Sequence, residues 1–188
     1  MVTPNNAEIV YLVIQEQQQE RGTVMPARRG IVIICGPMFS QKSADLMLRE
    51  QKARHAGHAV LTVKPITDTR DDSVRSRTGL QTSCIKIDAH EPEEILELAT
   101  DKDVVIIDEA QFFSSAIVTV VQKLYQRGKR VLIACLDADL FGKPFGPVPL
   151  LLAIPEAEIK RKRAVCQKCQ SDNATRTDLK DKKLRRAL

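Results

Sequence analysis

Two short stretches carry residues whose types and spacing suit phosphate chemistry. The first begins at Gly36 and ends in Lys42-Ser43. This spacing is typical of a phosphate-binding loop, in which backbone N–H groups surround the phosphate, the lysine supplies charge and the hydroxyl holds Mg²⁺. The second stretch is the pair Asp108-Glu109. Beside such a loop, the first carboxylate suits Mg²⁺ binding and the second suits removal of a proton from a hydroxyl group.

Each of these stretches follows an apolar run that predicts a buried strand. Residues 31–35 and 104–107 show no polar alternation, which is typical of strands covered on both faces. A helix is predicted from Ser43. The same reading predicts strands at 59–63, 85–87 and 130–134, an edge strand at 159–165, and helices at 91–99 and 115–127. Alternating strands and helices indicate an α/β fold with a mostly parallel sheet and helices on both faces.

Other readings of the two stretches stay open. A phosphate loop has glycine directly before the lysine, and this chain has Gln41 there. A residue with a side chain held in the left-handed conformation costs about 1–2 kcal/mol. Residues 36–43 could therefore be an ordinary strand–turn–helix junction. The two acids could also mark only the point where a strand meets water.

The cysteines contain half of a possible zinc site. Cys166 and Cys169 have the spacing of two ligands, but no Cys or His follows them, and tetrahedral zinc needs four ligands. The alternative is a pair of reduced thiols at a turn. We expect weak zinc binding or none, and a poorly ordered segment after Cys169. Five cysteines without a secretory signal predict a reducing, cytoplasmic location.

Charge and length suggest three regions: an extension over 1–29, an α/β domain over 30–155, and an appendage with a basic tail over 156–188. Of the 188 residues, those from 160 onward include eleven Lys or Arg and three Asp, a local charge of +8 against +5 for the whole chain. The tail has no aromatic residue to stack on a base, so we expect a solvated end rather than a nucleic-acid site. No apolar run approaches the roughly 20 residues of a membrane span.

Taken together and in order, the motifs resemble those of the zinc-containing cytosolic thymidine kinase family. The resemblance covers about residues 30–178. It rests on the loop from Gly36 to Ser43, Asp68 with Arg70, the run 108–113, Leu136-Asp137 with 144–146, and Ala164-Val165-Cys166 with Cys169.

The resemblance implies a phosphate-loop kinase domain, with a partial zinc-ribbon and lasso segment, that uses ATP and Mg²⁺ to phosphorylate the 5′-hydroxyl of thymidine. The implied catalytic residues are Glu109 as base, Lys42 and Arg70. Met38, Phe112 and Leu140 are the implied nucleoside contacts. Ser43 and Asp108 would bind Mg²⁺, and Cys166 and Cys169 would bind Zn²⁺. The implied ATP contacts are Gly36, Pro37, Met38, Phe39, Ser40, Gln41, Lys42, Ser43, Asp68, Asp108 and Gln111.

The family also implies a homo-oligomer, with a tetramer as its habit. Three departures from the family pattern concern activity: Gln41 in the loop, Leu140 where the family usually has Phe, and a chain that ends before the second cysteine pair. The alternative function is therefore a catalytically impaired, nucleotide-binding descendant.

Overall fold

The sheet has the parallel architecture predicted from the alternating pattern. The computed structural model of the chain describes residues 27–66, 73–75 and 81–178. Within these ranges six strands form one sheet in the order β5-β2-β6-β7-β1-β8, and all neighbouring pairs are parallel. The strands are β1 (Gly30–Cys35), β2 (Val60–Pro65), β5 (Ile85–Ile87), β6 (Val104–Ile107), β7 (Arg130–Cys135) and β8 (Ala157–Arg161).

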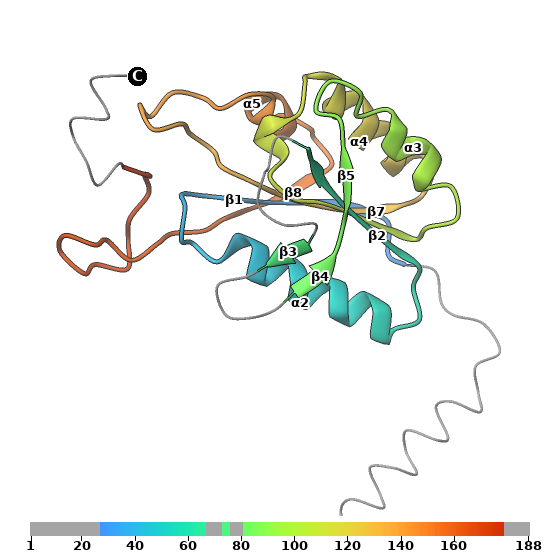
Figure 1. Cartoon of the computed structure of the whole chain (residues 1–188), viewed down its shortest axis with the longest axis horizontal. Helices are drawn as coiled ribbons and strands as arrows, with labels where there is room; N and C mark the ends of the chain where they lie inside the picture. Colours follow the sequence, from blue (N-terminus) through green and yellow to red (C-terminus); the bar gives the residue numbers. More distant parts are fainter. Residues whose placement is uncertain (1–26, 67–72, 76–80, 179–188) are drawn as a thin grey trace, which may run out of the picture.

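Helices cover both faces of this sheet, as Figure 1 shows. One face carries α2 (Lys42–His55), and the other carries α3 (Glu94–Leu98), α4 (Ala116–Gln126) and α5 (Val148–Leu152). Successive strand residues point to opposite faces, so each strand contributes to two cores. From β1, Val32 and Ile34 pack in the cluster of α2, whereas Ile31 and Ile33 pack in the cluster of α4. This double burial explains why the central strands lack polar alternation.

One strand continues further than the sequence indicates. The predicted strand ends at residue 63, before Lys64-Pro65, because proline removes a donor and cannot continue a central strand. Instead β2 includes Pro65, which pairs with Ile87 of β5. The pairing with β6 ends at Val63. Pro65 therefore lies where the strand has a neighbour on one side only, and that position tolerates proline.

A small hairpin lies against α2. It consists of β3 (Ser73–Arg75) and β4 (Gln81–Ser83), which pair antiparallel. Strand β3 lies in a polar stretch over residues 67–79, and the other residues of that stretch lie outside the described ranges. The Thr82 hydroxyl donates a hydrogen bond to Glu50 Oε1 of α2 at 2.8 Å. Glu50 is buried and also accepts two hydrogen bonds from Arg54. The hairpin is thus attached to the helix that follows the candidate loop.

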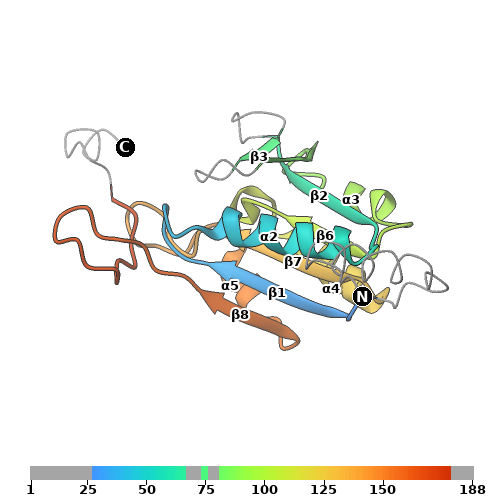
Figure 2. The same cartoon turned by 90° about the horizontal axis from the view of Figure 1, so that it is seen from below.

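The edge strand β8 of the six-stranded sheet begins after the predicted domain boundary at residue 155. β8 pairs with β1 from Ala157 to Arg161, two residues earlier than the predicted edge strand. In Figure 2, β1 and β8 run side by side, and the chain after β8 continues beyond the edge where β1 leads into α2. The C-terminal segment therefore starts next to the candidate phosphate loop. In the described part of the chain, no helix is long and apolar enough to cross a membrane.

Candidate phosphate-binding and catalytic site

The turn between β1 and α2 has the layout of a phosphate loop and requires a glycine at its start. Gly36 has a φ of +147°, and an added methyl group would collide with the carbonyl oxygen of Lys162. Gln41 is the N-cap residue of α2, with φ 62° and ψ 29°. This is the left-handed conformation that the missing glycine predicts, and its cost is about 1–2 kcal/mol. The Gln41 side chain is exposed and makes no capping hydrogen bond.

Inside the loop, one carbonyl group organises two side chains. The oxygen of Pro37 accepts a hydrogen bond from Lys42 Nζ at 2.7 Å and another from Ser40 Oγ at 2.8 Å. Burial lowers the pKa of Lys42, and the carboxylates of Glu109 and Asp108 partly offset this effect. The lysine therefore lies within the electrostatic reach of both predicted acids.

Asp108 follows β6 and is buried at the base of α2. Its Oδ2 accepts a hydrogen bond from Ser43 Oγ at 3.3 Å, and its Oδ1 accepts one from the backbone N–H of Glu109 at 3.0 Å. Burial, and then the charge of Glu109, raise the pKa of Asp108 to about 7. A hydroxyl and a carboxylate from two elements are hard oxygen donors, which suit Mg²⁺. The predicted pair Ser43 and Asp108 thus fits this cation.

Glu109 is held by a neighbour two residues along the chain. It has φ 51° and ψ 42° and precedes the short 3₁₀ helix η1 (Ala110–Phe112). Gln111 Nε2 donates to Glu109 Oε2 at 2.6 Å, and Gln111 Oε1 accepts from the backbone N–H of Leu136 at 3.0 Å. Gln111 is buried. We predicted Gln111 among the ATP contacts; in the structure its side chain connects Glu109 to the end of β7.

The predicted nucleoside contacts come from three different segments. Phe112 is 38% exposed and packs edge to face on Phe145, with ring centroids 5.4 Å apart. Met38 in the loop after β1 and Leu140 in the loop after β7 are both half-buried. The structure therefore leaves apolar groups partly accessible on η1 and on both loops.

A glycine allows the loop after β7 to approach η1. Gly146 has a φ of +50°, and an added methyl group would collide with the carbonyl oxygen of Gln111. In the same loop, Asp139 accepts hydrogen bonds from the backbone N–H groups of Phe141 and Lys143, both at 2.8 Å. These contacts define the loop that the sequence linked to substrate. Asp68 and Arg70, the other predicted pair, lie outside the described residues.

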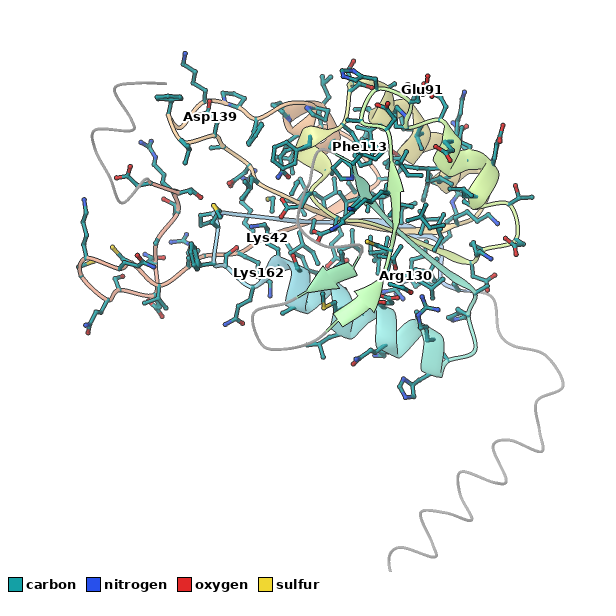
Figure 3. The ribbon with its side chains drawn as sticks, viewed as in Figure 1. Lys42, Glu91, Phe113, Arg130, Asp139 and Lys162 are labelled. Carbon is teal, nitrogen blue, oxygen red and sulfur yellow. The ribbon has the colours of Figure 1, made fainter. Side chains whose placement is uncertain are left out.

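Two residues near this site carried no signal in the sequence. Lys162 belongs to a run of basic residues that we expected to be solvated. Its ammonium group pairs with Asp45 Oδ2 at 2.7 Å, and Arg49 pairs with the other oxygen at 2.7 Å. Burial raises the pKa of Asp45, but the hydrogen bonds from Lys162 and Arg49 outweigh it, and the net pKa is lowered. Figure 3 shows Lys162 beside the start of α2. The second residue, Thr177, accepts a hydrogen bond from Met38 N at 2.9 Å.

The cysteine pair lies on a hairpin, and the expected disorder after Cys169 is not observed up to residue 178. Ala164 and Ala174 exchange two backbone hydrogen bonds of 2.9 Å, and Cys166 N donates to Ser171 O at 2.7 Å. Hydrogen bonds from the backbone of Cys169, and then of Lys168, lower the pKa of Cys166. A stabilised thiolate suits zinc. Among the residues described, however, no group of three or more potential ligands occurs, and the hairpin offers two candidates where tetrahedral zinc needs four.

Comparison with solved structures finds distant similarity to replication initiators. The AMPPCP-bound DnaA of Aquifex aeolicus is 15% identical with a TM-score of 0.45, and 89% of this chain aligns with 50% of that one. Domain III of Thermotoga maritima DnaA is 12% identical with a TM-score of 0.45, and 86% of this chain aligns with 64% of that one. The chain thus spans half to about two thirds of these structures, and this similarity assigns no function.

Sequence comparison is far more specific. The thymidine kinase family model matches residues 29–185. A thymidine kinase of Coprothermobacter proteolyticus is 41% identical over 147 residues, which are 77% of this chain and 72% of that protein. The family-model match covers the phosphate loop, the acid pair after β6 and the cysteine hairpin. This chain belongs to the thymidine kinase family of enzymes.

Proposed function

We propose that this chain transfers the γ-phosphate of ATP to the 5′-hydroxyl of thymidine. The observation that supports this most directly is the placement of Glu109. Its carboxylate accepts a hydrogen bond of 2.6 Å from Gln111. Glu109 directly follows Asp108, which accepts a hydrogen bond from Ser43, and its negative charge partly offsets the lowered pKa of Lys42. A candidate base, the Lys42 ammonium group and two candidate Mg²⁺ ligands are thus grouped at one end of the sheet, as phosphoryl transfer requires.

In this reaction Glu109 accepts the proton of the 5′-hydroxyl. The oxygen of that hydroxyl forms a bond to the γ-phosphorus, and the bond from the γ-phosphorus to the oxygen bridging to the β-phosphate breaks, so that ADP leaves. Lys42 and the backbone N–H groups of the loop bind the phosphate oxygens where charge accumulates. Gln111 fixes the orientation of the Glu109 carboxylate.

Ser43 and Asp108 would hold Mg²⁺, which neutralises charge on the β- and γ-phosphate oxygens when bound. Asp108 must lose its proton to act as a ligand. The family resemblance also implies zinc at Cys166 and Cys169, for which the described part of the chain offers two candidate ligands, and assembly into a homo-oligomer. These points, and the cytoplasmic location predicted from the cysteines, stay predictions.

One observation favours the alternative of an impaired, nucleotide-binding descendant. Gln41 directly precedes the phosphate-binding lysine in the left-handed conformation, and it carries a Cβ where the motif has glycine. The backbone there must approach phosphate closely, which is why the motif has glycine. A chain that binds ATP without turnover would fit this departure.

A phosphate-transfer assay distinguishes the two functions. The purified chain is incubated with Mg²⁺, thymidine and γ-labelled ATP, and labelled dTMP is quantified. Glu109→Gln should lower kcat by about 10²–10⁴-fold, the usual contribution of a general base, while ATP still binds. The matched control is Glu91→Gln, which changes an exposed glutamate remote from Lys42 in Figure 3 and should leave kcat unchanged.

The outcomes separate cleanly. ATP binding without dTMP formation by the unmodified chain would favour the impaired descendant. An unchanged kcat in Glu109→Gln would exclude Glu109 as the base.

A further inference from the structure

The peptide group between Pro37 and Met38 is held from both sides. Its carbonyl oxygen accepts hydrogen bonds from Lys42 Nζ at 2.7 Å and Ser40 Oγ at 2.8 Å. Its N–H donates to Thr177 Oγ1 at 2.9 Å. One planar unit therefore connects the lysine of the phosphate loop to Thr177, which lies 139 positions after Met38 in the chain.

The C-terminal hairpin brings Thr177 to this position. The chain leaves β8 with Lys162, whose backbone N–H donates to Cys35 O at 2.7 Å, and it turns back through the bridge between Ala164 and Ala174. Beyond that bridge Arg176 lies against the loop after β7, where a methyl group added to Gly142 would be 3.6 Å from the guanidinium carbon. Thr177 follows directly and reaches Met38. The segment thus spans from one ligand-facing loop to the other.

We propose that Thr177 is a positioning residue for Lys42, acting through the Pro37–Met38 peptide group. A trans amide is planar, so its N–H and C=O point in opposite directions and an orientation imposed on one is imposed on the other. The ring of Pro37 also fixes φ on the carbonyl side. Thr177 therefore directs the Pro37 oxygen that in turn fixes the Lys42 ammonium group. Without this constraint, a long lysine side chain samples several rotamers and must be ordered by the phosphate itself.

The inference rests on the proposed use of Lys42 in ATP binding, and ATP binding without thymidine is the first test. Thr177→Val keeps the shape of the side chain but removes the acceptor. Its Kd for Mg-ATP, measured by titration calorimetry, should rise about fivefold, the fold-change that one lost net hydrogen bond produces. Thr177→Ser restores the hydroxyl and should bind ATP as the unmodified chain does. The matched control is Thr175→Val, the same substitution at an exposed threonine of the same segment.

A second readout follows Lys42 itself. Its rate of acetylation, quantified by mass spectrometry relative to the other lysines, should rise several-fold in Thr177→Val and stay unchanged in Thr177→Ser and Thr175→Val. The hydrogen bond to the Pro37 oxygen and partial burial limit access of the reagent to the Lys42 nitrogen, and both restrictions weaken when the side chain is released.

Each result decides a separate point. An unchanged Lys42 rate in Thr177→Val, or an equal rise in Thr175→Val, would overturn the positioning role. If the unmodified chain binds no ATP, the proposed function fails, whereas the acetylation rates still decide whether Thr177 positions Lys42.

Discussion

The side-chain amide of Gln111 donates a hydrogen bond of 2.6 Å to Glu109, a residue held in the left-handed conformation at φ 51°. The other end of the amide is fixed by the backbone N–H of Leu136. A hydrogen bond to a charged acceptor contributes about 1.5–3 kcal/mol, enough to offset a cost of about 1–2 kcal/mol for the left-handed backbone. The amide therefore links the orientation of the candidate base to the end of the neighbouring strand β7.

Replacing Gln111 with Met should impair catalysis without changing any group that reacts. Met has similar length but offers no amide to Glu109 and leaves Leu136 N without its acceptor. We expect kcat to fall about 5–30-fold, equivalent to about 1–2 kcal/mol, and the free energy of unfolding to fall by about 1–3 kcal/mol. Steady-state kinetics and urea unfolding measure the two effects. Gln122→Met, at an exposed position of α4, is the control; an unaltered kcat in Gln111→Met would show that Glu109 is oriented by other contacts.

Restoring glycine at position 41 should strengthen ATP binding. Gln41 is left-handed at φ 62° and its side chain is exposed, so Gln41→Gly removes strain and a Cβ while no buried contact is lost. We expect the affinity for ATP to rise about tenfold or more. Gln41→Ala keeps the Cβ and the strain and separates the backbone effect from loss of the amide. Weaker ATP binding in Gln41→Gly than in Gln41→Ala would mean that this loop does not use the glycine conformation.

The stability of the metal-free protein should depend on Asp108 between about pH 4 and pH 7. Its pKa in the fold is about 7 against an ordinary value of 3.8, so the folded state binds this proton more tightly than the unfolded state. The stability that this group contributes is complete below pH 4 and is lost as pH rises to about 7, a change on the order of 2–4 kcal/mol. Asp108→Asn should therefore gain stability relative to the unmodified chain as pH rises, measured by chemical unfolding at several pH values. A constant difference between the two proteins across this range would rule out a raised pKa.

Magnesium should offset the loss of stability that a rise in pH causes through Asp108. The ion competes with the proton on Asp108, so Mg²⁺ should raise the melting temperature more at pH 8 than at pH 6. Differential scanning calorimetry with and without Mg²⁺ measures this, and Asp108→Asn should show little response at either pH. An equal response in both proteins would place Mg²⁺ elsewhere.

The cysteines should divide into two classes of reactivity. Cys35 and Cys135 are buried and their pKa values are raised by burial, whereas the pKa of Cys166 is lowered by backbone hydrogen bonds from its turn. Because the thiolate is the reactive form, a disulfide reagent should label Cys166 and the exposed Cys169 rapidly in the native protein. The buried pair should react only on unfolding. Peptide mapping identifies the labelled sites, and rapid native labelling of Cys35 would contradict the burial of β1.

The hairpin that carries Cys166 and Cys169 is expected to bind zinc only weakly. Two thiolates and water bind this metal much less tightly than four protein ligands do. Zinc should therefore slow the labelling of Cys166 only when added in excess. One tightly held zinc per chain in the purified protein, found by metal analysis, would show that further ligands complete the site.

Several features followed from the sequence by itself because they depend on local pattern. The apolar runs that became β1, β6 and β7 lie between helices that cover both faces, and such strands must be apolar at every position. The left-handed conformation of Gln41 followed from its place in the loop motif, since neighbouring residues impose the backbone there. The acid pair was recognisable because charged residues directly after a buried strand are costly unless they serve a purpose.

Other features depended on contacts between distant parts of the chain, which no local pattern encodes. Pro65 is accepted in β2 because β6 stops pairing at Val63, and that limit exists only in the assembled sheet. Lys162 and Thr177 belong to a polar, basic stretch that resembles a solvated tail. The pairing of β8 with β1 places Lys162 against Asp45, and the return of the hairpin after β8 places Thr177 against Met38. The residue types at the site could be identified from sequence, but the residues that hold them in place could be identified only from the tertiary structure, because hydrogen bonds across 139 residues leave no periodic signal.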